Sequence, residues 1–213
     1  MDVNGIVIKN RDVGDSDKLV TIATPQGLLT AKAKGVKKAS SKLKSFVGVL
    51  SFGEFSVAES KAGFVLNGAN VTESFYNCWS DPDRYAAAML CLEIFEKCNA
   101  RVRIFPASDG EIVGFIDLLK TLSDVNYGEF YPPAFALKYG VSVAVSMGLD
   151  VTGDVFPDGV KELFLAIYNS SDPTAVLADY NNATVKNLLM HLAAGFKADL
   201  NVDLTVASEI FRM

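Results

Sequence analysis

The sequence predicts an α+β protein in which an all-β N-terminal part is followed by an all-helical part. Short segments of alternating apolar and polar residues, separated by turn residues, fill residues 3–75. From Ser80 onward, apolar residues recur every three or four positions, which is the spacing of an amphipathic helix. The charge also changes there. Residues 1–76 carry ten basic and seven acidic side chains, whereas residues 77–213 carry ten and eighteen, and the net charge of the whole chain is −5.

The N-terminal segments have the pattern of short strands in a small barrel. Residues 18–24 are rich in β-branched side chains and end at the turn Pro25-Gln26-Gly27. Residues 27–34 then place Lys32 and Lys34 on the face opposite to the apolar side chains. Further strands are expected at residues 3–9, 47–59, 64–67 and 71–75. The glycines that suit bends and bulges are Gly48, Gly53 and Gly63. About five strands with outward basic residues predict an OB-fold barrel, with a generic β-sandwich as the alternative.

The second part has the pattern of a bundle of five or six helices. The first helix is expected after Ser80-Asp81-Pro82, a start signal with proline near the first helical position. The other expected helices cover residues 112–122, 135–147, 160–167, a short piece from residue 172, and 184–196. No flexible linker separates the two parts. We therefore predict an N-terminal domain at residues 1–77 and a helical domain at residues 78–213.

Cysteine and histidine content argues against most catalytic and metal-binding chemistry. Cys78, Cys91 and Cys98 contain no CxxC pair, so neither a disulfide framework nor a four-cysteine zinc site is expected. We interpret these thiols as buried structural residues. His191 is the single histidine of the chain and is interpreted as structural or surface-exposed. We therefore expect no enzymatic activity and no cofactor.

Two loops resemble ligand-binding motifs without matching them. The loop that begins at Gly35 lacks the second glycine and the following Lys-Ser/Thr of a phosphate-binding P-loop. Asp12, Asp15 and Asp17 miss the spacing of a calcium loop, so we interpret them as turn residues. No apolar run reaches the roughly 18–20 residues of a membrane helix, and residues 1–5 lack the start of a secretory signal. The chain is expected to be soluble and cytoplasmic.

A cluster of lysines is the strongest candidate for a binding surface. Six lysines fall within thirteen residues that contain no acidic side chain: Lys32, Lys34, Lys37, Lys38, Lys42 and Lys44. The alternative is a solvated loop without a ligand. On an OB barrel, such a surface follows the phosphates of a nucleic acid strand while aromatic rings stack on its bases. Phe46 borders the loop and is the candidate base-facing ring, whereas Phe52, Phe55 and Phe64 are expected in the core.

Several segments resemble the RecO family of bacterial recombination mediators. They are Gly5-Ile-Val-Ile-Lys9, Arg11-Asp-Val-Gly-Asp-Ser-Asp-Lys-Leu-Val20, Ala33-Lys-Gly-Val-Lys-Lys38 and Phe52-Gly-Glu-Phe55. The resemblance extends through residues 72–75 into the helix around Tyr85. Further on, it is limited to the helical layout and the turn at residues 147–149. Many family members carry a four-cysteine zinc insertion after the equivalent of residues 148–150. Residues 151–157 contain no cysteine, so no zinc is expected.

The resemblance implies a protein that binds single- and double-stranded DNA and anneals complementary strands. It also implies cooperation with RecR to load RecA onto strands covered by the single-stranded-DNA-binding protein, SSB. The expected phosphate-binding residues are Lys9, Arg11, Lys32, Lys34, Lys37, Lys38, Lys42 and Lys44. The acidic helical part is expected to be a scaffold and protein-binding surface, with the SSB C-terminal tail as a partner, and the protein is expected at the nucleoid. The alternative is an OB-fold adaptor that binds proteins and has no direct role on DNA.

Overall fold

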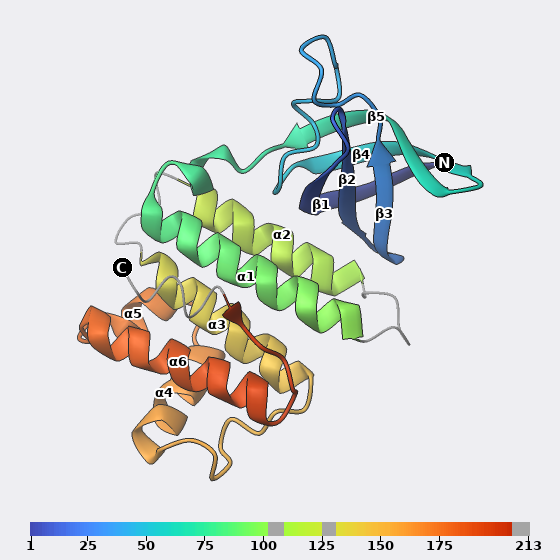
Figure 1. Cartoon of the computed structure of the whole chain (residues 1–213). Helices are drawn as coiled ribbons and strands as arrows, with labels where there is room; N and C mark the ends of the chain where they lie inside the picture. The colour runs from blue at the N-terminus through green and yellow to red at the C-terminus, as the bar shows by residue number, and fades with distance from the viewer. Residues whose placement is uncertain (102–108, 125–130, 206–213) are drawn as a thin grey trace. The chain divides into compact units, whose positions relative to one another are not determined.

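The computed structural model describes residues 1–101, 109–124 and 131–205, and its N-terminal strands form a closed barrel (Figure 1). The strands are β1 (Asp2–Val13), β2 (Asp17–Thr24), β3 (Gly27–Ala33), β4 (Phe52–Ser60) and β5 (Gly63–Glu73). Their order around the barrel is β1-β2-β3-β5-β4. Neighbouring strands are antiparallel except for β3 and β5, which run parallel. Because the sheet closes on itself, the structure confirms the predicted OB-type barrel and not the alternative β-sandwich.

Two strand boundaries differ from the sequence prediction. The strand expected at residues 47–59 starts only at Phe52, because residues 47–50 form bends and turns. The strands expected at 64–67 and 71–75 are one continuous strand, β5. The pairing register of β4 and β5 shifts twice, between Phe52 and Gly53 and between Ser56 and Val57. Such bulges interrupt the alternation along a strand, so one long strand has the sequence pattern of two.

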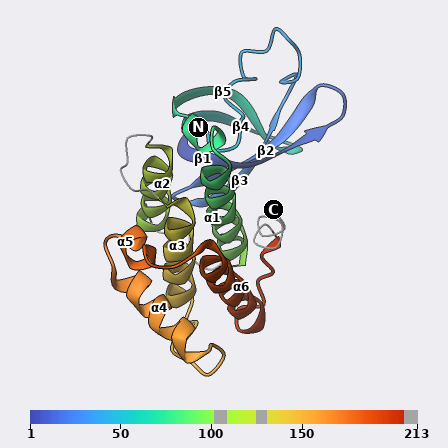
Figure 2. The ribbon, with the colours of Figure 1, turned by 90° about the vertical axis from the view of Figure 1, so that its left-hand side faces the viewer.

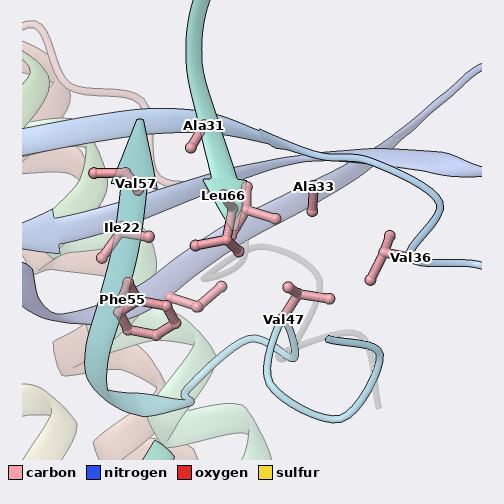
Figure 3. Packing of buried hydrophobic residues seen from close by; sticks show 10 residues of the cluster. Ile22, Ala31, Ala33, Val36, Val47, Phe55, Val57 and Leu66 are labelled. Atoms are coloured by element: carbon pink, nitrogen blue, oxygen red, sulfur yellow. The ribbon is translucent and has the colours of Figure 1, made fainter. Parts of the chain in front are cut away.

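The barrel core contains ten apolar residues from its strands and from the loop between β3 and β4 (Figure 3). They are Val7, Val20, Ile22, Ala31, Ala33, Val36, Val47, Phe55, Val57 and Leu66. Gly53 lets β4 approach β5 closely, because a Cβ atom there would lie 2.2 Å from the Asn70 carbonyl oxygen. The bulge expected at Gly53 agrees with the shift of pairing register between Phe52 and Gly53.

The second part is helical, as predicted. Its elements are a short 3₁₀ helix, η1 (Tyr76–Trp79), and the helices α1 (Pro82–Arg101), α2 (Asp109–Ser123), α3 (Pro132–Ser146), α4 (Asp158–Asn169), α5 (Pro173–Leu177) and α6 (Asn182–Ala198). Helix α3 contacts α4, α5 and α6, and Figure 2 shows it among them. Gly140 allows close packing, because a Cβ there would lie 2.6 Å from Leu192 Cδ2 of α6.

Local signals account for several helix ends. Asp81 caps α1, since its Oδ1 accepts hydrogen bonds from the backbone N–H groups of Asp83 and Arg84 at 3.0 and 2.9 Å. Asn181 caps α6 through its Oδ1 and the Thr184 N–H, at 2.9 Å. Gly148 follows the end of α3 with a φ of +88°, a left-handed conformation that glycine adopts readily. These ends therefore follow from short-range sequence.

The chain divides into two compact units. One comprises Met1–Phe75 with Asn99–Ile116, and the other Tyr76–Cys98 with Asp117–Met213. The domain assignment 1–77 and 78–213 stays a prediction.

The thiols of Cys78, Cys91 and Cys98 are buried and form no disulfide, and burial raises the pKa of the Cys91 thiol. Within the described residues, no helix has both the length and the apolar character of a membrane span.

Candidate nucleic-acid interface

The loop between β3 and β4 carries most of the predicted phosphate-binding residues and projects from the barrel (Figure 1). We call residues 34–46 the lysine loop. Val36 and Val47, at its two ends, are 1% and 3% exposed and belong to the barrel core (Figure 3). Leu43 packs against the same core from within the loop. Three apolar anchors therefore hold the backbone, while the lysines between them face solvent.

Backbone hydrogen bonds attach the lysine loop to the turn between β1 and β2. The Lys37 N–H donates to the Ser16 carbonyl at 2.9 Å, and the Gly35 N–H donates to Asp17 Oδ1 at 2.7 Å. Gly35 has a φ of +64°, a left-handed value that glycine tolerates without strain. Further hydrogen bonds join Lys38 to Gly35, Ser41 to Lys38 and Phe46 to Leu43. The loop is thus a series of turns held against the barrel.

Four lysines of the loop are exposed and have no ion-pair partner among the described residues. They are Lys34, Lys38, Lys42 and Lys44. Adjacent like charges of this kind create a local positive potential even on a chain with net negative charge. Ammonium groups on a fixed backbone can contact phosphate oxygens without reading base sequence. Within the lysine loop, these four residues are therefore the most open to a ligand.

Lys32 and Lys37 instead bind carboxylates of the β1–β2 hairpin. Lys32 Nζ lies 3.0 Å from Asp17 Oδ2, and Lys37 Nζ lies 2.7 Å from Asp12 Oδ2. The sequence interpretation placed these aspartates in a turn, but Asp12 belongs to the end of β1 and Asp17 to the start of β2, and only Asp15 lies in the turn between them. The carboxylates of Asp12 and Asp17 reach across to the lysine loop and to β3. Neither ion pair could be predicted from a local sequence pattern, because the partners are distant along the chain.

The same contacts keep both carboxylates ionised. The Gly35 N–H, the Lys32 ammonium and the Ser16 hydroxyl lower the pKa of Asp17 to about 2. The Lys37 ammonium, followed by Lys18, lowers the pKa of Asp12. Both aspartates are therefore negatively charged at neutral pH. The turn between β1 and β2 forms an anionic edge beside the cationic loop.

The remaining cations of the predicted set lie on the outer face of the barrel. Lys9 and Arg11 are exposed on β1, opposite Thr21 and Leu19 of β2. Leu19 is in turn opposite Lys32 of β3, so Arg11 and Lys32 belong to one row across three strands. In OB folds, the β2–β3 face is a common site for oligonucleotides. The barrel thus brings Arg11 and Lys32 onto a face of that kind.

Sequence analysis did not identify two polar residues on this outer face. The hydroxyls of Thr21 and Thr30 lie 3.3 Å apart between β2 and β3. Thr21 also lies opposite Lys9 of β1. Hydroxyl groups at such positions can donate hydrogen bonds to phosphate oxygens. The outward position of Thr21 and Thr30 could have been predicted from the sequence, because they alternate with Val20, Ile22 and Ala31, which are buried.

The aromatic residues near the loop differ in exposure. Phe55 is fully buried, and Phe64 is partly buried against the barrel core, as expected. Phe52 is also partly buried. Phe46 is partly exposed at the end of the lysine loop, next to the buried Val47. Part of the Phe46 side chain is therefore accessible to a ligand at the loop.

A comparison with known families matches the segment that forms the barrel and the lysine loop. Residues 1–75 match the family described as recombination protein O, N-terminal. The N-terminal barrel is therefore similar to the N-terminal part of RecO proteins. All nine predicted DNA-binding residues fall inside the matched segment, whereas the helices beyond residue 75 lie outside it.

Individual relatives support the same assignment. DNA repair protein RecO of Acetivibrio thermocellus is 36% identical over 90 residues, 41% of this chain and 36% of the relative. The RecO protein of Dehalococcoides mccartyi is 29% identical over 135 residues, 63% of this chain and half of the relative. The RecO protein of Clostridium perfringens is 32% identical over 93 residues, 43% and 38% of the two chains. The matched segments thus span between about a third and half of these RecO relatives.

The helical unit has a groove of its own that sequence analysis did not predict. It lies between α4 and α6 and has a volume of about 550 Å³. Val160, Leu163 and Leu188 provide apolar walls, while Glu162 and His191 provide polar groups. Because α4 and α6 come together only in the folded chain, no local sequence motif marks this groove.

Among the residues that the structure describes, no cluster of three or more His, Cys, Asp or Glu side chains could hold a metal.

Proposed function

We propose that this chain is a recombination mediator in DNA repair that binds single- and double-stranded DNA through its N-terminal barrel. The observation that carries the proposal is the family match of residues 1–75, combined with the exposed lysines that this segment presents. Relatives that are similar to this segment are named DNA repair proteins. We assign DNA binding to residues 1–77 and the contacts with proteins to residues 78–213.

The proposed DNA path begins at the lysine loop. Lys34, Lys38, Lys42 and Lys44 contact phosphates, and Lys37 joins them, while Lys9, Arg11 and Lys32 extend the path over the outer face of β1–β3. Phe46 stacks on an unpaired base next to the loop. Contacts of this kind hold a strand without sequence preference. They are compatible with annealing, because the base edges stay available for pairing.

The similarity of residues 1–75 to RecO proteins supports the finer steps of this proposal. The protein anneals complementary strands and acts with RecR to load RecA onto DNA covered by SSB. We assign the contact with the SSB tail to the acidic helical half, which serves as the protein-binding surface. The proposed mediator is non-enzymatic, needs no zinc or other cofactor, and acts in the cytoplasm at the nucleoid. These steps are tested by strand annealing of labelled oligonucleotides, and by RecA loading with and without RecR.

Fluorescence anisotropy of a labelled single-stranded oligonucleotide tests the DNA-binding step. If the four exposed lysines of the loop each neutralise one phosphate, log K should fall with log salt at a slope of roughly −3, since each contact contributes about −0.7, and contacts from the other cations of the path would make it steeper. Alanine at both Lys34 and Lys38 should weaken binding to all sequences alike and make that slope shallower by about 1.4. Alanine at both Lys120 and Lys186 removes the same charge from α2 and α6 and should leave the slope unchanged.

The acidic balance of residues 77–213 favours a second function, an OB-fold adaptor that binds proteins alone. In that case, the wild-type protein would not bind the oligonucleotide at about 50 mM salt, where electrostatic affinity is high. Binding that the Lys34 and Lys38 variant retains in full would instead show that the DNA path avoids the lysine loop.

A further inference from the structure

Asp12 and Asp17 both bind lysines, but their surroundings differ. Asp17 accepts hydrogen bonds from the Gly35 backbone N–H at 2.7 Å and from the Ser16 hydroxyl at 3.0 Å, in addition to its pair with Lys32. It therefore fixes the backbone of the lysine loop. Among the residues that the structure describes, Asp12 instead contacts only side-chain ammonium groups, those of Lys37 at 2.7 Å and Lys18 at 3.6 Å. Asp17 has a structural role that Asp12 lacks.

The pair of Asp12 and Lys37 lies open to solvent at the base of the lysine loop. The side chain of Asp12 is 55% exposed and that of Lys37 is 35% exposed. The backbone of Lys37 is held independently, because its N–H donates to the Ser16 carbonyl at 2.9 Å. The Lys37 ammonium can therefore exchange one anionic partner for another without moving the loop. Lys18 is likewise held by a second contact, a 3.0 Å hydrogen bond to Asn10 Oδ1.

We propose that Asp12 is an internal competitor of the DNA phosphates, which occupies Lys37 in the free protein and is displaced when a phosphate binds. This inference rests on the proposed DNA-binding function of the lysine loop. A carboxylate and a phosphate offer the same kind of acceptor to an ammonium group, so they compete for one position. The contact lowers the affinity for DNA, since binding must first break it.

Asp12 also stabilises the lysine loop in the protein without DNA. Lys34, Lys37, Lys38, Lys42 and Lys44 repel one another, and residues 34–46 contain no acidic side chain. Asp12 reduces this repulsion from outside the loop, because its carboxylate lies beside Lys37. When DNA is bound, the Asp12 carboxylate lies near the phosphates and repels them. Asp12 thus sets a balance between the stability of the loop and the strength of DNA binding.

The matched control is Asp15, at the tip of the same turn. Asp15 is exposed and has no ion-pair partner among the residues that the structure describes. Asp12→Asn and Asp15→Asn therefore remove the same charge from the same hairpin. We expect Asp12→Asn to bind a single-stranded oligonucleotide about two to five times more tightly than wild type at low salt, the range that an exposed ion pair contributes. Asp15→Asn should change the affinity by less, and Asp12→Ser should repeat the gain.

A double-mutant cycle with Lys37→Ala identifies the partner. In the Lys37→Ala background, Asp12→Asn should raise the affinity no more than Asp15→Asn does, because the competed position is gone. Circular dichroism of each variant checks that the barrel is folded. Equal gains for Asp12→Asn and Asp15→Asn, or a gain that persists without Lys37, would overturn the inference alone. Wild-type protein that does not bind DNA would overturn the proposed function as well.

Discussion

The side-chain amide of Asn10 in β1 donates a 2.8 Å hydrogen bond to the carbonyl oxygen of Val47, at the far end of the lysine loop. The Asn10 carbonyl oxygen meanwhile accepts from Lys18 at 3.0 Å. One side chain thus joins the first strand, the second strand and the end of the loop. The position of the lysines therefore depends on a residue that carries no charge.

Asn10→Ala removes this link and should lower the free energy of unfolding by about 1 kcal/mol, the usual contribution of one intramolecular hydrogen bond. Urea denaturation measures the change. Asn67→Ala, at an exposed position of β5, is the control and should change stability by less. An Asn10→Ala protein as stable as wild type would show that Val47 is held by apolar packing alone.

Asp17 makes stability depend on pH in the acid range. Its pKa falls from 3.8 to about 2 on folding, so its stabilising contribution is complete above 3.8 and is lost as the pH drops from 3.8 through about 2. Asp17→Asn cannot titrate and should lose less stability over that interval. Denaturation at pH 7, 4 and 2.5 measures this. Parallel pH curves for wild type and Asp17→Asn would contradict the assigned contacts.

Gly53→Ala should destabilise the barrel strongly. The new Cβ would lie 2.2 Å from the Asn70 carbonyl oxygen and 2.8 Å from Val71 Cα, and neither backbone atom can move away cheaply. Overpacking of this kind costs about 1–3 kcal/mol or more. Gly68→Ala is the control within the same strand pair, because its Cβ would meet Ser56 at an ordinary 3.6 Å. Thermal unfolding compares the two, and similar melting temperatures would contradict the close approach of β4 and β5.

Arg11→Ala should weaken binding of a single-stranded oligonucleotide and make the salt slope shallower by about 0.7, the share of one phosphate contact. Arg11 lies in the same row of the outer face as Leu19 and Lys32. Thr30→Ala, on the same face, removes no charge and should keep the wild-type slope. An unchanged slope for Arg11→Ala would restrict the DNA path to the lysine loop.

Phe46→Ala should weaken binding of single strands without changing the salt slope, because stacking contributes about 1–3 kcal/mol per base and releases no counterions. The partly exposed position of the ring at the end of the lysine loop supports this role. Phe46→Tyr keeps an aromatic face and should retain most of the affinity. Equal affinities for the alanine variant and the wild-type protein would show that the ring only packs against the barrel.

Short-range patterns predicted much of the fold. The alternation of residues 27–33 indicated strand β3 with Lys32 outside and Ala31 and Ala33 inside, as the burial confirms. Asp81 and Pro82 marked the start of α1. Such features depend on φ and ψ preferences and on one apolar face, which neighbouring residues determine. The continuity of residues 63–73 as one strand was missed, because bulges in its pairing with β4 interrupt the alternation.

The sequence by itself determined the barrel followed by helices, the concentration of lysines at residues 32–44 and the resemblance to the RecO family. Only the tertiary structure decided which of these lysines are open to a ligand. Lys37 meets Asp12 because the lysine loop is held against the β1–β2 hairpin, and Lys32 meets Asp17 because β2 pairs with β3. Electrostatic interactions act through space and not along the chain, so the lysine cluster could be counted from the sequence but its ion pairs could not.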